Sequence, residues 1–101
     1  IVVDAGAKGA LVRGGKSLLP SGVRGTQKTF RAGDVVSLLD QAGQEFGRGL
    51  ANYGRDEVER IKGLHSHEIA EVLGARPYDE VIHRDNLVIL EDPAATGRGV
   101  T

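Results

Sequence analysis

The stretch VVSLLDQAGQEFGRGLANY (residues 35–53) carries the pattern that decides the fold. Two runs rich in strand-forming residues, 35–39 and 44–53, flank an Asp-Gln-Ala-Gly turn signal, so we expect an antiparallel hairpin. Gly47 and Gly49 are two apart in the second run and therefore lie on one face. Positions without a side chain allow a sharp bend or the close approach of another backbone, as small barrels require. The stretch therefore predicts a small barrel.

The segments before the hairpin are predicted to form one helix and several strands. Asp4 is placed to cap a helix that runs to about Arg13 and ends at the two glycines that follow. Residues 16–39 lack a helical period and hold apolar residues between Gly and Pro, which indicates short strands.

Two short helices are predicted after the hairpin. Residues 55–62 follow an amphipathic helical pattern, with acidic residues near the start and a lysine at the end. Gly63 is positioned to end this helix. Ser66 is placed to cap the second helix, whose apolar residues follow i, i+3, i+4 spacing up to Gly74.

The C-terminal part of the chain is predicted to form strands followed by a tail. Residues 81–82 and 87–90 are apolar strand material around the polar tetrad 83–86, and the last strand is expected to close the barrel. Residues 91–101 are small and polar, which indicates a tail. The sequence thus predicts one domain over residues 1–90, mainly β with small α-helices (α+β).

Composition narrows the class of protein. With 101 residues, 27% of them charged, and a net charge of -1, the chain fits one soluble domain with one core. The absence of Cys excludes disulfides, thiolate zinc sites and a cysteine nucleophile. No apolar run approaches the ~18 residues of a membrane span. Among cellular compartments, the cytoplasm fits this sequence best. Because Met is absent even at position 1, we expect a piece of a longer chain.

The charges are unevenly distributed along the chain. Residues 1–31 hold one acid and six basic residues, while the remainder is net acidic. This asymmetry leaves binding to structured RNA open, through phosphate contacts rather than stacking because only four aromatic residues are present. The alternative is that folding intersperses these charges over the surface. The candidate RNA-contacting cations are Lys16, Arg24, Lys28 and Arg31.

Two short motifs are similar to phosphotransfer motifs but fail in context. GGKS (14–17) resembles the end of a P-loop, yet the first motif glycine would fall on Ala10 and the lysine follows a predicted helix instead of opening one. HRD (83–85) matches three letters of a kinase catalytic loop, but Leu90 stands where that loop needs Asn. A structural turn over residues 83–86 is the favoured interpretation.

A histidine cluster is the remaining candidate for chemistry. His65, His67 and Glu68 offer metal donors, with His83 as a distant third nitrogen ligand. Two histidines two apart at a helix start point in different directions, so surface exposure is the favoured interpretation. We therefore predict no metal, cofactor-binding or catalytic residue in this chain.

Four segments in register resemble one family. They are GKSLLPSGV (15–23), FRAGD (30–34), GRGL (47–50) and EVIHRDNLVIL (80–90). Together they are similar to the C-terminal PUA domain of the glutamate 5-kinases, over nearly all of residues 1–90. The chain departs from that pattern at Gly47, where Ala is common, and near Gly54 or Arg55, where a Ser is common.

The resemblance implies a pseudobarrel and a parent enzyme. That enzyme would transfer the γ-phosphoryl of ATP, with magnesium, to L-glutamate and form L-glutamyl 5-phosphate in proline biosynthesis in the cytoplasm. Its catalytic sites would lie in an amino-acid-kinase domain of the same chain, and the parent would be a homo-oligomer without membrane contact. The resemblance also implies that RNA contacts in other PUA domains correspond here to residues 14–17.

Two roles for this domain remain open, and they belong to different classes of protein. The favoured role is a non-catalytic accessory or regulatory domain that acts through contact with the kinase domain or neighbouring subunits. The alternative is an RNA-binding module that uses the basic N-terminal third. Fold analogy alone does not assign RNA binding.

Overall fold

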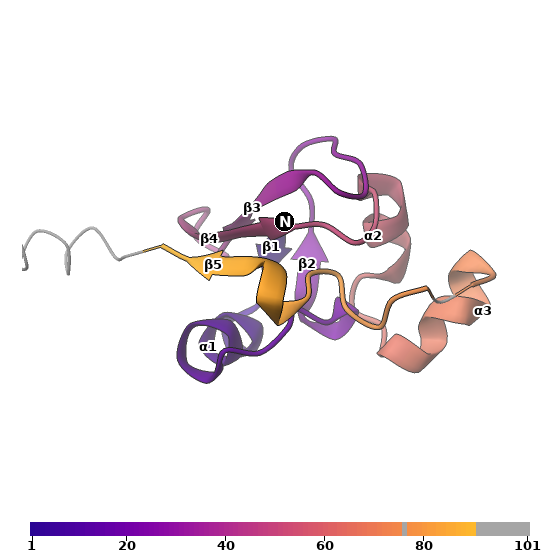
Figure 1. The fold of residues 1–101 in the computed structure, drawn as a ribbon, viewed down its shortest axis with the longest axis horizontal. Coiled ribbons are helices and arrows are strands. Elements are labelled where there is room, and N and C mark those ends of the chain that lie inside the picture. The colour runs from indigo at the N-terminus through magenta and orange to yellow at the C-terminus, as the bar shows by residue number, and fades with distance from the viewer. Residues whose placement is uncertain (76, 91–101) are drawn as a thin grey trace, which may run out of the picture.

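The computed structural model describes residues 1–75 and 77–90. These residues form an open five-stranded sheet in the order β2-β1-β3-β4-β5, with one α-helix below it and two others on its right in the view of Figure 1. Neighbouring strands are antiparallel except β1 and β3, which are parallel. The elements are β1 (Val2–Val3), α1 (Ala5–Gly14), β2 (Val23–Gly25), β3 (Val35–Leu39), β4 (Glu45–Leu50), α2 (Arg55–Ile61), α3 (Ile69–Leu73) and β5 (Leu87–Ile89).

The first helix begins and ends as the sequence predicts. The Asp4 carboxylate accepts the Ala7 N–H at 2.7 Å and so caps α1. At the other end, Gly15 has a φ of 59° and donates its N–H to the Ala10 carbonyl. Glycine adopts this left-handed conformation without a steric cost, which allows the chain to leave the helix there.

A lysine links α1 to the turn of the hairpin. The Lys8 ammonium lies 3.0 Å from the Asp40 carboxylate and 5.3 Å from the centre of the Phe46 ring. The Asp40 carboxylate also accepts the Gln44 and Ala42 N–H groups, and these contacts together lower its pKa, the Gln44 bond contributing most. The turn and the helix are thus held together by one carboxylate.

The predicted hairpin is confirmed, with a shorter second strand. β3 and β4 pair antiparallel, with Val36 opposite Gly49 and Leu38 opposite Gly47. The expected strand to residue 53 ends at Leu50 because the Asn52 N–H bonds to the Val81 carbonyl at 2.8 Å instead of continuing along β3. The chain therefore changes partner at this point.

The two glycines of β4 do allow another backbone to approach closely. A Cβ atom on Gly47 would lie 3.0 Å from the Val88 carbonyl oxygen. A Cβ atom on Gly49 would lie 2.9 Å from the Asn86 carbonyl oxygen and 2.7 Å from the Ile82 side chain. Segment 82–89 therefore packs directly onto β4.

The helix predicted over residues 55–62 is confirmed as α2, followed by Gly63 with a φ of 79°. The second predicted helix is correct in place but wrong in its cap. Residues Ser66–Glu68 form a 3₁₀ turn before α3, and the Ser66 hydroxyl donates to the Asp79 carbonyl. The Glu68 carboxylate instead accepts the His65 N–H at 2.9 Å.

The expectation that the last strand closes the barrel is wrong, although the mainly β fold class is confirmed. β5 pairs with β4, and β2 is at the opposite edge of the sheet. Across the gap, the described part of the chain makes a single isolated bridge, between Leu18 and Ile82. Three-residue edge strands leave too few ladder positions to close the sheet. The tail predicted over residues 91–101 lies outside the described residues.

The core lies between the sheet and the helices. Strands β1, β2 and β3 and all three α-helices contribute side chains with 2% exposure or less, and with Phe46 of β4 these form one hydrophobic cluster. The largest fully buried side chains are Tyr53, Leu11, Leu18, Leu38, Ile61, Ile69 and Ile82.

Candidate functional site

A pocket of about 470 Å³ lies between α1 and the segment that follows it. Its wall is mostly apolar, with Ala7 and Leu11 from the helix and Leu19, which is 44% exposed, from the other side. Among its charged lining residues are Lys16 and the two acids Asp4 and Glu80. One ammonium facing two carboxylates gives the pocket little attraction for a polyanion.

The residues that resemble a P-loop lie at the wrong end of a helix. Gly14 is the last residue of α1, and Lys16 donates its backbone N–H back to the Ala10 carbonyl at 3.4 Å. A helix C-terminus presents carbonyl oxygens and a partial negative charge, which repels phosphate. These residues do not fit ATP, and within residues 1–75 and 77–90 no group of three His, Asp or Glu side chains could hold a metal ion.

The four candidate RNA-contacting cations are exposed, and the structure spreads them out. Lys16 lines the pocket beside α1. Lys28 lines a second pocket between the loop of residues 27–30 and β3. Arg31 lines a third pocket near the start of α2, and Arg24 lies on the edge strand β2. No two of the four cations line the same pocket.

A cation that the sequence did not single out, Arg84, is bonded through its backbone to Ser17, the residue that follows Lys16. The Arg84 backbone N–H donates to the Ser17 hydroxyl at 2.8 Å, across 67 residues of sequence. The Arg84 side chain is exposed beside the segment that carries Lys16. No local pattern could reveal this pair, because it depends on how segment 82–89 packs onto the sheet.

The HRD motif forms a structural turn, as expected. Residues Arg84–Asn86 make one 3₁₀ turn in which the His83 Nδ1 atom accepts the Asp85 N–H at 3.1 Å. The Asn86 N–H donates to the His83 carbonyl at 2.9 Å. The Asp85 carboxylate is largely exposed, 3.6 Å from the His83 ring. The motif thus joins the segment before β5 to β5.

The hydrogen bond between Ser17 and Arg84 should contribute measurably to stability. We expect Ser17→Ala to lower the free energy of unfolding by about 0.5–1.5 kcal/mol, because the Arg84 N–H loses its acceptor. Ser21→Ala is the matched control, since Ser21 is exposed and lies on the same segment. Urea titrations of both variants check this, and equal midpoints would contradict it.

The histidine cluster does not converge on a ligand. The His65 and His67 rings stack with 5.7 Å between centroids, and both side chains are exposed. The Glu68 carboxylate is used by the His65 N–H, and His83 belongs to the turn before β5. The three histidines therefore do not form one site among the described residues.

Among the residues that the structure describes, Glu59 is the carboxylate with the most strongly lowered pKa, and its role is structural. Its oxygens accept hydrogen bonds from Lys62 Nζ at 2.6 Å and from the Thr26 hydroxyl and N–H at 2.6 and 2.8 Å. These donors, Lys62 first, lower the pKa of Glu59 from 4.5 to about 2. The carboxylate fastens the loop after β2 to α2.

This shift predicts a pH dependence of stability. Because the folded pKa is depressed, the stabilisation is present above pH ~5 and is lost as pH falls toward about 2. We expect Glu59→Gln to unfold at lower urea than the unmodified chain at pH 6, with a difference that shrinks toward pH 2. Glu71→Gln, at an exposed position of α3, is the control. A difference independent of pH would contradict the assignment.

The outer face of the sheet exposes aliphatic side chains that sequence reasoning missed. Val35, Leu50 and Val88 are 67%, 39% and 63% exposed. Val35 is opposite Leu50, and Val88 is opposite Arg48, so strand alternation places them on one face. We call these four residues the outer sheet face. The sequence did contain a signal for this face, because adjacent apolar residues in a strand point to opposite faces of the sheet.

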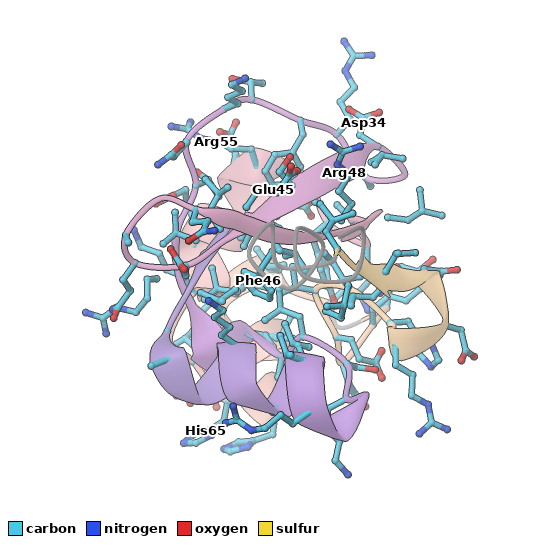
Figure 2. The ribbon with its side chains drawn as sticks, turned by 90° about the vertical axis from the view of Figure 1, so that its left-hand side faces the viewer. Asp34, Glu45, Phe46, Arg48, Arg55 and His65 are labelled. Atoms are coloured by element: carbon cyan, nitrogen blue, oxygen red, sulfur yellow. The ribbon has the colours of Figure 1, made fainter. Side chains whose placement is uncertain are left out.

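The charge on this face is neutralised internally. Arg48 donates to both Glu45 carboxylate oxygens, at 3.0 and 3.3 Å. The pairing lowers the pKa of Glu45 and raises that of Arg48. Figure 2 shows Glu45 and Arg48 on the side of the hairpin away from α1, while Phe46 points toward that helix. An apolar face whose ion pair carries no net charge is better suited to contact another protein surface than to bind a phosphate group.

A sequence model described as the PUA domain matches residues 1–73. The chain belongs to the PUA domain family. The crystal structure of a PUA domain from Aeropyrum pernix K1 in a tartrate complex superimposes on this PUA domain with a TM-score of 0.62 and 26% identity. The match covers 92% of this chain and 44% of that one.

Curated relatives of this PUA domain are longer proteins. A glutamate 5-kinase of Caldanaerobacter subterraneus is 55% identical over 90% of this chain and 24% of its own length. A glutamate 5-kinase of Anaeromyxobacter dehalogenans is 53% identical over 97% of this chain and 25% of its own length. The PUA domain thus spans about a quarter of the glutamate 5-kinases that it matches. No helix among the described residues is long and apolar enough to cross a bilayer.

Proposed function

We propose that this PUA domain is the non-catalytic C-terminal part of a glutamate 5-kinase. The observation that carries the proposal is 55% identity over 90% of the chain to an enzyme of which it covers a quarter. The longer chain would phosphorylate L-glutamate with ATP and magnesium to L-glutamyl 5-phosphate in proline biosynthesis, in the cytoplasm. Catalysis would belong to an amino-acid-kinase domain outside residues 1–101.

The role proposed for the domain is accessory or regulatory, through contact with the rest of the enzyme. Its support is the outer sheet face, where three exposed aliphatic side chains surround an ion pair that is already satisfied. When protein covers this face, aliphatic side chains leave water, which is favourable, and no unpaired charge is buried. The occupant would be the kinase domain of the same chain or a neighbouring subunit of a homo-oligomer.

The test compares the full-length enzyme with a form that lacks residues 1–101. We expect the isolated PUA domain to release no ADP from ATP and glutamate, because its described residues hold no phosphate cradle. Val88→Glu in the full-length enzyme should reproduce part of the change in kinetics or assembly that the deletion causes. Val12→Glu, at an exposed position of α1, is the control.

Two results would contradict this proposal. Glutamate-dependent ADP release by the repurified PUA domain would overturn the assignment of catalysis to the missing part. Deletion and Val88→Glu that both leave kinetics and assembly unchanged would remove the accessory role.

A second candidate function is binding of structured RNA beside α1. The observation that favours it is that the exposed Arg84 bonds through its backbone N–H to Ser17, the residue after the exposed Lys16, at the segment to which the family resemblance points. Two phosphate contacts, one from each cation, would give a slope of log affinity against log salt of about -1.4, at roughly 0.7 per contact. Affinity should therefore fall with salt and depend little on base sequence.

Two double variants locate this binding. Lys16→Glu with Arg84→Glu should weaken it, whereas Lys28→Glu with Arg31→Glu, which changes the charge equally on a different loop, should not. Fluorescence anisotropy with a structured RNA at several salt concentrations measures both. No binding at low salt, or binding that the first pair leaves intact, would overturn an RNA site beside α1.

A further inference from the structure

A pocket of about 550 Å³ lies beside the first residue of the chain. One wall is β3, with Val35 and Ser37, and the other is the loop of residues 27–30. Ile1 lines one end, and its side chain is 6% exposed, as part of the core. The pocket is therefore a slot that continues the line of β1 along β3.

The hydrogen bonds at Ile1 define which backbone groups face this slot. The Ile1 nitrogen donates to the Ser37 carbonyl at 2.8 Å, and the Leu39 N–H donates to the Ile1 carbonyl at 2.8 Å. The N–H and C=O of one strand residue point to the same side, and alternate residues share that side. The Ser37 N–H and the Val35 carbonyl therefore also point toward the slot.

The other side of β3 is already occupied. The Ala51 N–H bonds to the Asp34 carbonyl at 3.0 Å, and Val36 and Leu38 are in register with the two glycines of β4. Among the described residues, the loop backbone makes no hydrogen bond to the Ser37 N–H or to the Val35 carbonyl. The edge of β3 from Val35 to Ser37 is thus open toward the slot, and Val35 is 67% exposed.

We propose that, in the longer chain, the residues that precede Ile1 extend β1 into this slot as a parallel strand on β3. The residue two places before Ile1 would accept the Ser37 N–H and donate to the Val35 carbonyl. This continues the register that Ile1 already has, and strand addition to an open edge is a common mode of docking. The inference rests on the proposed function, since relatives of this domain are about four times as long.

The extension would couple the PUA domain to the preceding part of the enzyme. β3 is the middle strand of the sheet, bonded to β1 on one side and β4 on the other. A connection that enters as a paired strand fixes the direction in which the rest of the chain leaves the domain. A flexible linker would leave that direction free.

Amide exchange at Ser37 tests the proposal in two proteins, the 101-residue chain and the full-length enzyme. We expect the Ser37 amide to exchange at least about 100-fold more slowly in the full-length enzyme, because a paired strand amide exchanges only on opening. The Leu39 amide, which is bonded to Ile1 in both proteins, is the internal reference. Equal exchange at Ser37 in the two proteins would overturn the proposal.

A pair of substitutions gives an independent measurement. Ser37→Pro removes the amide and should lower the urea midpoint of the PUA transition more in the full-length enzyme than in the 101-residue chain. Ser37→Ala keeps the amide and loses only the hydroxyl that contacts Glu45, so its effect should be the same in both. Equal effects of Ser37→Pro in the two proteins would contradict strand addition.

Glutamate kinase activity of the full-length enzyme separates the two proposals. An active enzyme with a fast-exchanging Ser37 amide would remove the strand extension and leave the proposed function standing. An enzyme without glutamate kinase activity but with a protected Ser37 amide would remove the proposed function and support the strand extension.

Discussion

Replacing Gly49 with valine is expected to lower the free energy of unfolding by about 3 kcal/mol, and Gly49→Ala by about 2 kcal/mol. A Cβ atom at this position would lie 2.9 Å from the Asn86 carbonyl and 2.7 Å from the Ile82 side chain. Ile82 is fully buried, and Asn86 belongs to a turn bonded to His83, so neither can move without disturbing its neighbours. The strain should therefore separate the last segment from β4.

Gly6→Ala is the matched control, with an effect of opposite sign. Gly6 lies in α1, and its added Cβ would have only the Asp4 carboxylate oxygen nearby, at 3.5 Å. Alanine limits the unfolded chain and favours the helix, so stability should rise by roughly 0.5 kcal/mol. Urea titration followed by circular dichroism measures all three variants. A Gly49→Ala midpoint equal to that of Gly6→Ala would contradict the close approach.

The elements that were predicted correctly are those whose signals are local. The cap at Asp4, the left-handed Gly15 and the Asp40 turn each depend on residues within a few positions of one another. Backbone sterics and side-chain hydrogen bonds decide such features before the chain packs. The close approach at Gly47 and Gly49 was predictable for the same reason, although its partner was not.

The features that were missed depend on long-range packing. The barrel was expected to close through the last strand, but β5 pairs with β4 at one edge of the sheet and β2 is at the other edge. The meeting of Ser17 with Arg84 spans 67 residues and has no local signal. Ser66 was expected to cap a helix, but its hydroxyl bonds to the Asp79 carbonyl instead.

The candidate site was less predictable than the fold. The four cations were chosen from charge along the sequence, and the structure places three of them at separate pockets and Arg24 on the edge strand β2. The outer sheet face combines residues from three strands, so its extent becomes visible only when their register is known. Surface function depends on this register, whereas local propensity depends on neighbours in sequence.

Replacing Tyr53 with alanine is expected to lower the free energy of unfolding by about 3–5 kcal/mol, which is a large part of the stability of a small domain. Tyr53 is 2% exposed, and its ring packs edge-on against that of Tyr78 with 5.9 Å between centroids. Its hydroxyl donates to the Tyr78 carbonyl and accepts the Tyr78 N–H. One side chain thus fills the core and fastens the chain that leads to the buried Val81 and Ile82.

Tyr53→Phe and Tyr78→Phe separate the packing of Tyr53 from its hydrogen bonds. Tyr53→Phe keeps the ring but leaves the partly buried Tyr78 N–H and carbonyl without this partner, so it should cost about 1–3 kcal/mol. Tyr78→Phe removes a hydroxyl from a side chain that is 48% exposed and keeps both backbone bonds, so it should cost less than about 0.5 kcal/mol. Urea titration of the three variants checks the order. If the two phenylalanine variants unfold at the same midpoint, the Tyr53 hydroxyl does not hold the segment, and ring packing alone positions the approach to β5.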